Sequence, residues 1–123
     1  MVVVSRSIHV DAPVDEVFAL MADPAARTQL NPLVSAGSAE IEGGGPVDVG
    51  CTCHFRFVVR GRQVEYRAQI REFEPPRRIV SLAQAAVPFE VCIETEPEGQ
   101  GTRLTQTERF EPTDAMLDDA IPD

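Results

Sequence analysis

Strict alternation of apolar and polar side chains in residues 63–71 constrains the fold of this chain more than any other feature. Val64, Tyr66, Ala68 and Ile70 occupy one set of alternate positions, and Glu65, Arg67, Gln69 and Arg71 occupy the other. Because successive side chains of a strand point to opposite faces, this pattern predicts an amphipathic strand. We expect the apolar set to face the interior. By the same alternation, two other predicted strands also direct apolar residues inward, one through Cys51, Cys53, Phe55, Phe57 and Val59 and the other through Phe89, Val91 and Ile93.

Six extended runs follow one another after residue 33. We expect strands at about 34–42, 49–59, 63–73, 78–85, 88–96 and 102–110. The connections between them are short and rich in glycine and proline, which is typical of tight turns. Short links between successive strands predict hairpins and therefore an antiparallel meander.

The chain begins with a predicted strand at 2–10 and a helix that ends near residue 23. Pro13 suits the first turn of this helix, with Asp11 or Ala12 as the expected N-cap, and Val14, Val17, Phe18 and Met21 recur at helical spacing. A second short helix is expected at 24–30, and a terminal helix of about two turns from residue 113. The predicted fold class is α+β: a curved antiparallel sheet of about seven strands, two short helices after the first strand and a shortened C-terminal helix.

Composition limits the function. The 123 residues predict one domain spanning 1–123, and 20 acidic against 11 basic side chains give a net charge of −9. This charge disfavours nucleic acids and anionic membranes as partners. All basic residues except the histidines are arginine, so no lysine is present for Schiff-base chemistry. The N-terminus lacks the long apolar run of a signal peptide, and we expect a cytoplasmic protein with reduced cysteines.

The order of the predicted elements, together with several local motifs, resembles one superfamily. The motifs are Ala12-Pro13-Val14-Asp15-Glu16-Val17-Phe18, Asn31-Pro32-Leu33, Glu72-Phe73-Glu74-Pro75-Pro76-Arg77-Arg78-Ile79 and Gly101-Thr102-Arg103-Leu104-Thr105-Gln106-Thr107. The chain thereby resembles the START-like (SRPBCC, Bet v 1-like) helix-grip proteins, in particular their polyketide cyclase/dehydrase branch. The resemblance implies a cavity for a hydrophobic molecule between the sheet and a C-terminal helix, with catalysis in some members only.

The closing helix possible here is much shorter than is usual in that superfamily. An apolar sheet face left open to water favours association. We therefore expect a homodimer in which a second copy covers the open face, or else a longer functional form of the chain.

The final predicted strand carries the most suggestive polar residues. Leu104 sets the inward parity, so Gln106 and Glu108 are expected to face the cavity, where an apolar environment would favour proton transfer by Glu108. Tyr66 could orient a substrate carbonyl with its hydroxyl. The alternative is that Glu108 is solvated or paired with Arg56 or Arg109. The expected ligand-binding residues are Phe55, Phe57, Val64, Ala68, Phe89, Val91 and Leu104.

The segment Cys51-Thr52-Cys53-His54 contains residue types that bind metals. Alternation places both thiols on one face and His54 on the other, which argues against a shared metal ion. His9 also lies opposite the apolar rows, and solvent is the expected environment of both histidines. We expect neither a metal nor a cofactor.

Two functions are compatible with these patterns. The first is binding of a small hydrophobic molecule, polyketide-, lipid- or aromatic-like, by a carrier or by a polyketide cyclase/dehydratase. The second is a non-catalytic protein-interaction module similar to the Hsp90-activator-like relatives of the same fold.

Overall fold

The computed structural model describes residues 1–26, 34–59, 61–84 and 87–112. They form seven strands and one helix of nine residues, α1 (Val14–Ala22). The strands are β1 (Val2–Val10), β2 (Val34–Ile41), β3 (Thr52–Val59), β4 (Arg62–Glu74), β5 (Arg78–Gln84), β6 (Phe89–Glu98) and β7 (Gly101–Phe110). Of the second helix expected at 24–30, residues 24–26 are helical and the remainder lies outside the described residues, as does the terminal helix expected from residue 113.

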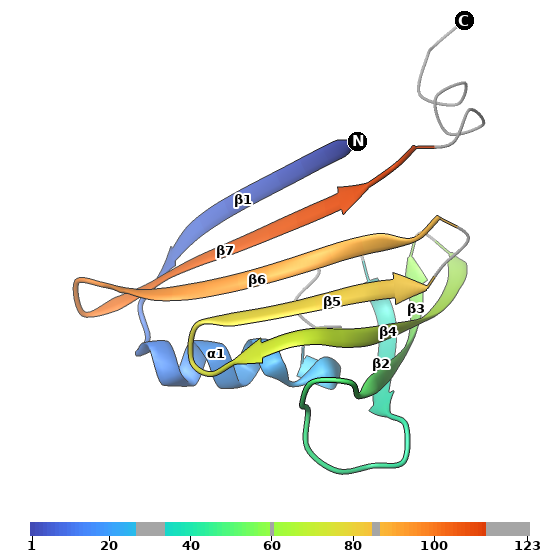
Figure 1. Ribbon diagram of the computed structural model, residues 1–123, viewed down its shortest axis with the longest axis horizontal. Coiled ribbons are helices and arrows are strands. Elements are labelled where there is room, and N and C mark those ends of the chain that lie inside the picture. Colours follow the sequence, from blue (N-terminus) through green and yellow to red (C-terminus); the bar gives the residue numbers. More distant parts are fainter. Residues whose placement is uncertain (27–33, 60, 85–86, 113–123) are drawn as a thin grey trace, which may run out of the picture.

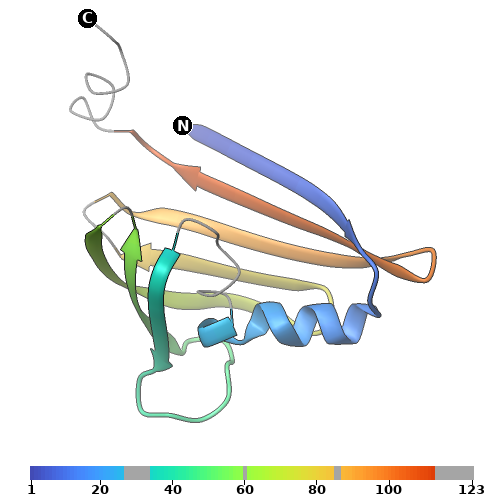
Figure 2. The ribbon, with the colours of Figure 1, turned by 180° about the vertical axis from the view of Figure 1, so that it is seen from behind.

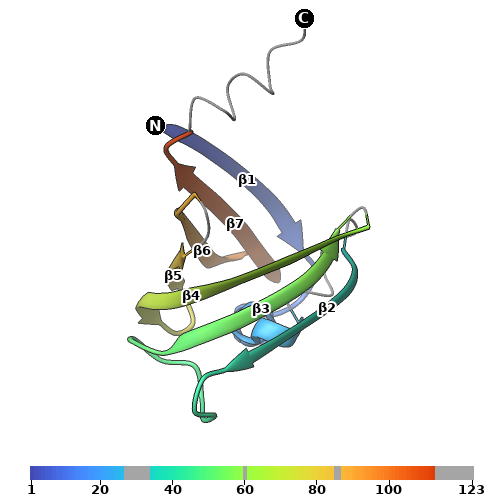
Figure 3. The ribbon, with the colours of Figure 1, turned by 90° about the vertical axis from the view of Figure 1, so that its right-hand side faces the viewer.

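The strands make one antiparallel sheet in the order β1-β7-β6-β5-β4-β3-β2. Strands β2 to β7 form the predicted meander, and β1 joins it by pairing with β7 (Figure 1). The sheet is strongly curved, and α1 lies inside the curve (Figures 2 and 3). We call the face towards α1 the concave face and the other the convex face.

Strand β3 begins at Thr52 and not at residue 49 as the alternation suggested. Gly50 has φ of +87°, a left-handed conformation that glycine adopts without steric cost. The amide of Cys51 donates to the carbonyl of Asp48 at 3.2 Å and closes a tight turn before the strand, while the Gly50 amide donates to the carbonyl of Ile70 on β4 at 2.8 Å. The apolar residue Val49 is consequently exposed in the loop.

Helix α1 covers part of the concave face. Its N-cap is Pro13, not Asp11 or Ala12, and the Pro13 carbonyl accepts hydrogen bonds from the amides of Glu16 and Val17. The predicted apolar stripe is confirmed, because Val17, Phe18 and Met21 are buried. Phe18 packs against Phe73 of β4 with ring centroids 5.7 Å apart.

A bulge in β4 explains how Phe73 meets α1. The register against β5 shifts between Ile70 and Glu72, which inserts one extra residue into the strand. Phe73 is therefore opposite Ile79 and returns to the concave face, although simple alternation from Ile70 would point it outward.

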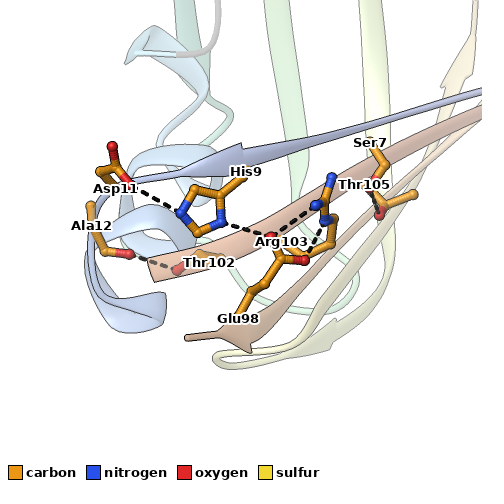
Figure 4. A network of polar contacts seen from close by, with 8 residues as sticks. All are labelled: Ser7, His9, Asp11, Ala12, Glu98, Thr102, Arg103 and Thr105. Atoms are coloured by element: carbon orange, nitrogen blue, oxygen red, sulfur yellow. Dashed lines mark hydrogen bonds and ion pairs between the residues drawn. The ribbon is translucent and has the colours of Figure 1, made fainter. Parts of the chain in front are cut away.

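Polar contacts connect β1, the approach to α1 and the β6–β7 hairpin (Figure 4). His9 places Nδ1 2.7 Å from Glu98 and Nε2 2.9 Å from Asp11, while Arg103 donates to both Glu98 oxygens at 2.6 and 2.8 Å. The fully buried Thr102 donates its hydroxyl to the carbonyl of Ala12 at 2.7 Å. These contacts fix where the chain leaves the sheet for α1.

The histidine of this network predicts pH-dependent stability. Hydrogen bonds to Glu98 and then to Asp11 raise the pKa of His9, while Arg103 and then His9 lower the pKa of Glu98. The His9 contribution should be complete below about pH 6.5 and lost as pH rises through the raised pKa; that of Glu98 should be lost as pH falls below about 4.3. We expect wild-type protein to lose more thermal stability than His9→Gln between about pH 6 and about pH 8.5.

Histidine resonances followed by NMR would check this assignment directly. The His9 midpoint should lie above its ordinary value and should fall in Glu98→Gln. A His9 midpoint at or below the ordinary value would show that the two carboxylates do not stabilise the imidazolium.

Candidate functional site

The concave face is lined by one residue row from each strand. Directly paired residues lie on the same face of a sheet. Ile79 on β5 pairs with Ile93 on β6, which pairs with Gln106 on β7, so all three lie on the concave face. The predicted inward positions at Cys53, Phe55, Ala68, Val91 and Ile93 are all buried in the core cluster. The side chain of Val59 lies outside the described part of the structure.

Four aromatic rings form a cluster on this face. Tyr66 lies 5.2 Å from Phe55, 5.6 Å from Phe57 and 5.5 Å from Phe89, measured between ring centroids. Phe55 is buried, whereas the other three rings are only partly buried. Beyond them Val64, which is opposite Phe57, is 40% exposed. The cluster is therefore buried at Phe55, and its other end, towards Val64, is apolar and accessible to solvent.

Most predicted ligand-binding positions contribute to this surface in different ways. Ala68 and Val91 are buried beneath it, and Leu104 is partly buried on β7 at the end nearer α1. Phe57, Val64 and Phe89 present accessible apolar surface. These positions could meet a guest from β3, β4 and β6.

Gln106 and Glu108 lie together on the concave face. The pairing of β7 with β6 and with β1 runs without a register shift, so both side chains keep the predicted orientation. Both are half-buried, and the Gln106 amide donates to Glu108 Oε1 at 3.1 Å. Tyr66 does not join them, because β5 and β6 separate β4 from β7.

The two arginines suggested as alternative partners of Glu108 bind other acids. Arg109 pairs with Glu90 at 3.3 Å, and Arg56 lies 3.8 Å from Glu65 and 4.0 Å from Glu40. These pairs occupy the convex face, opposite the row that contains Glu108. The carboxylate of Glu108 thus adjoins an amide on the concave face.

Arg6 is a concave-face residue that the sequence interpretation did not single out. It pairs with Gln106 in the β1–β7 ladder, between Val4 opposite Glu108 and Ile8 opposite Leu104. The signal was present in residues 2–10, because alternate positions read Val2, Val4, Arg6, Ile8 and Val10. One charged residue interrupts an otherwise apolar row.

The Cys-Thr-Cys-His segment divides between the two faces as alternation predicts. Cys53 is buried in the core, whereas His54 Nε2 lies 2.6 Å from Glu65 on the convex face. The His54 side chain is mostly covered, so the expectation of a solvated histidine is wrong for this residue. Among the described residues, no three histidine, cysteine or acidic side chains are grouped to hold a metal ion.

A hollow of about 440 Å³ lies away from the aromatic cluster, at the end of β5, β6 and β7 near the Arg77 turn. Arg77, Arg78, Arg103, Glu94 and Glu96 contribute to its wall. Each of the arginines already has an acidic partner within 3.2 Å. This charged hollow is unsuited to an apolar molecule, so the concave face is the better candidate site.

A curved antiparallel sheet that wraps around a helix defines the helix-grip class of fold. The chain belongs to the polyketide cyclase / dehydrase and lipid transport family, whose profile matches residues 1–122. Family and fold together support a ligand-binding role. A search of curated proteins found no match.

Solved structures share this architecture. Protein CV1439 from Chromobacterium violaceum superposes with a TM-score of 0.73 at 20% identity, covering 98% of this chain and 83% of its own. Ara h 8.0201 gives 0.69 at 14% identity over 97% and 87% of the two chains. The Polyketide_cyc-like protein Cgl2372 from Corynebacterium glutamicum gives 0.60 at 26% identity over 94% and 69%.

Within the described residues, no helix combines the length and apolar character needed to cross a membrane.

Proposed function

We propose that this protein binds a small hydrophobic molecule against the concave face of its sheet, with the guest in contact with the aromatic cluster. The observation that carries the proposal is the continuity of Phe57, Tyr66 and Phe89 with the exposed Val64. Exposed contiguous apolar surface on a folded protein commonly marks a binding site. Partly buried rings offer large, rigid contact area to an aromatic or lipid-like guest.

The finer proposal is catalysis of the cyclase/dehydratase type. Glu108 would transfer a proton, Gln106 would hold its carboxylate through the 3.1 Å hydrogen bond, and Tyr66 would orient the far end of a long substrate. Because Tyr66 and Glu108 lie on strands separated by two others, one small carbonyl could not contact both. An extended substrate that spans the face is required, and part of any acceleration would come from restricting its conformers.

A matched set of valine substitutions tests the binding proposal. Val4 and Val3 are neighbours on β1 with similar exposure, 44% and 53%, but Val4 faces the concave side and Val3 the convex side. We expect Val64→Asp and Val4→Asp to weaken binding of the neutral probe aminoanthracene by about tenfold or more, because a carboxylate in contact with an apolar guest must be desolvated. Val3→Asp should leave binding unchanged.

Tyr66 supplies the readout. The chain has one tyrosine and no tryptophan, so its intrinsic fluorescence reports from within the proposed site. Energy transfer from Tyr66 to the bound probe should be lost in the two concave variants and kept in Val3→Asp. Equal affinity in all three variants would contradict the proposal.

Extraction of purified protein would distinguish the two functions named above. A small molecule that copurifies with wild type and is lost in Val64→Asp supports ligand binding. A stable protein partner in a pull-down, with no bound molecule, would instead favour the interaction module. The homodimer stays a prediction; in it the exposed Val4, Ile8 and Val64 would be covered by the second copy.

A further inference from the structure

Arg6 occupies an unusual position for an arginine in so acidic a chain. Acidic residues outnumber arginines by 20 to 11, and six arginines of the described part have an acidic side chain within 4.0 Å. Arg6 has no such ion pair among the described residues, and it lies in the middle of a strand. Its guanidinium is therefore available to a group from outside the chain.

The surroundings of Arg6 are apolar on its own strand and polar across the ladder. Val4 and Ile8 flank it on the same face and are exposed, while Gln106 is directly opposite. The nearby acid, Glu108, is opposite Val4 and accepts a hydrogen bond from Gln106. An arginine with exposed apolar neighbours offers both a charged hydrogen-bond donor and a hydrophobic wall.

From these contacts we infer that the molecule bound on the concave face is an amphiphile with one oxyanion, such as a carboxylate, and that Arg6 holds this group at the rim. The inference rests on the function proposed above and names the chemical class of the ligand. Guanidinium groups bind carboxylates through two parallel hydrogen bonds, which fixes the orientation of the ligand as well as its position.

The sheet register sets the length of such a ligand. Val2 pairs with Phe110, which pairs with Phe89, so Arg6 and Phe89 are two inter-strand spacings apart, with β7 between them, and four positions apart along the strands. On a flat sheet this offset corresponds to about 16 Å, and the curvature of the sheet shortens it. A medium-length acyl chain or an extended aromatic acid would reach from Arg6 to the aromatic cluster.

Arg62 is the natural control because it has the same parity. It opens β4 opposite Val59, in the hairpin at the other side of the sheet from β1. Arg6→Gln and Arg62→Gln remove the same charge, so their effects on the net charge of −9 are identical. A difference in ligand binding between the two variants must therefore come from the position of the arginine that was replaced.

The experiment compares dodecanoate with dodecanol as competitors of aminoanthracene. The net negative charge of the protein disfavours the anion, so a preference for dodecanoate requires a local cation. We expect wild type and Arg62→Gln to bind dodecanoate about tenfold more tightly than dodecanol, the effect of one charge-assisted hydrogen-bonded pair. Arg6→Gln should lose this preference and retain its affinity for dodecanol.

The outcomes separate the inference from the function on which it rests. Equal binding of the two competitors by wild type, or loss of the preference in Arg62→Gln and not in Arg6→Gln, would overturn the role of Arg6 and leave hydrophobic binding intact. Failure of both competitors and of the probe to bind would remove the proposed function and the inference together.

Discussion

Phe18→Ala is expected to lower the free energy of unfolding by about 3–5 kcal/mol, the usual cost of removing a buried aromatic side chain. Phe18 is only 5% exposed and joins α1 to the sheet through Phe73. Its loss would leave a cavity between helix and sheet. Because the free energy of unfolding of a whole domain is only about 5–15 kcal/mol, this one substitution would remove a large part of the stability of the protein.

Urea denaturation of Phe18→Ala beside Leu20→Ala measures this effect. Leu20 is on the same helix but is 46% exposed, so its truncation should change stability by no more than about 0.5 kcal/mol. If Phe18→Ala is too unstable to purify, Phe18→Leu should show a smaller loss of the same sign. Equal stability of the Phe18 and Leu20 variants would mean that α1 does not pack on the concave face as described.

Gly101→Ala should destabilise the protein by about 1–3 kcal/mol, the range for overpacking a filled site. A methyl group at Gly101 would overlap the carbonyl oxygen of Val10 and lie 2.8 Å from two atoms of the His9 ring. The first of these is backbone and cannot rotate away. The expected response is displacement of β1, visible as faster hydrogen exchange of the β1 amides.

Gly99→Asn is the control in the same hairpin. Gly99 has φ of +60° and open space around its Cα, and asparagine tolerates this left-handed conformation better than most residues. We expect little change in β1 protection, because no side-chain atom at this position approaches β1. Faster exchange of β1 in Gly99→Asn but not in Gly101→Ala would refute the steric explanation.

Much of the concave face was predictable because the side-chain period of a strand is two. That period identified the inward rows containing Phe55, Tyr66 and Val91, and the turn residues placed the hairpins between them. The same rule oriented Gln106 and Glu108 correctly, since the β7 register is unbroken. Helical spacing likewise predicted the buried stripe of α1.

Simple alternation fails where the local geometry departs from it. The chain turns at Gly50, whose φ is positive, so β3 begins at Thr52 and not at residue 49. The bulge in β4 places Phe73 on the concave face, although alternation from Ile70 would place it on the convex face. A bulge adds one residue on one strand only, so its presence depends on the partner strand and leaves little trace in the local pattern.

The sequence alone determined the rows of side chains and the order of the hairpins, since both depend on residues close together along the chain. Only the tertiary structure decided which rows meet. The pairing of Arg6 with Gln106 joins the first strand to the last, and the burial of Phe18 depends on a helix crossing the sheet. Such contacts bring together distant segments, so their geometry is set by closure of the whole sheet and not by any local period.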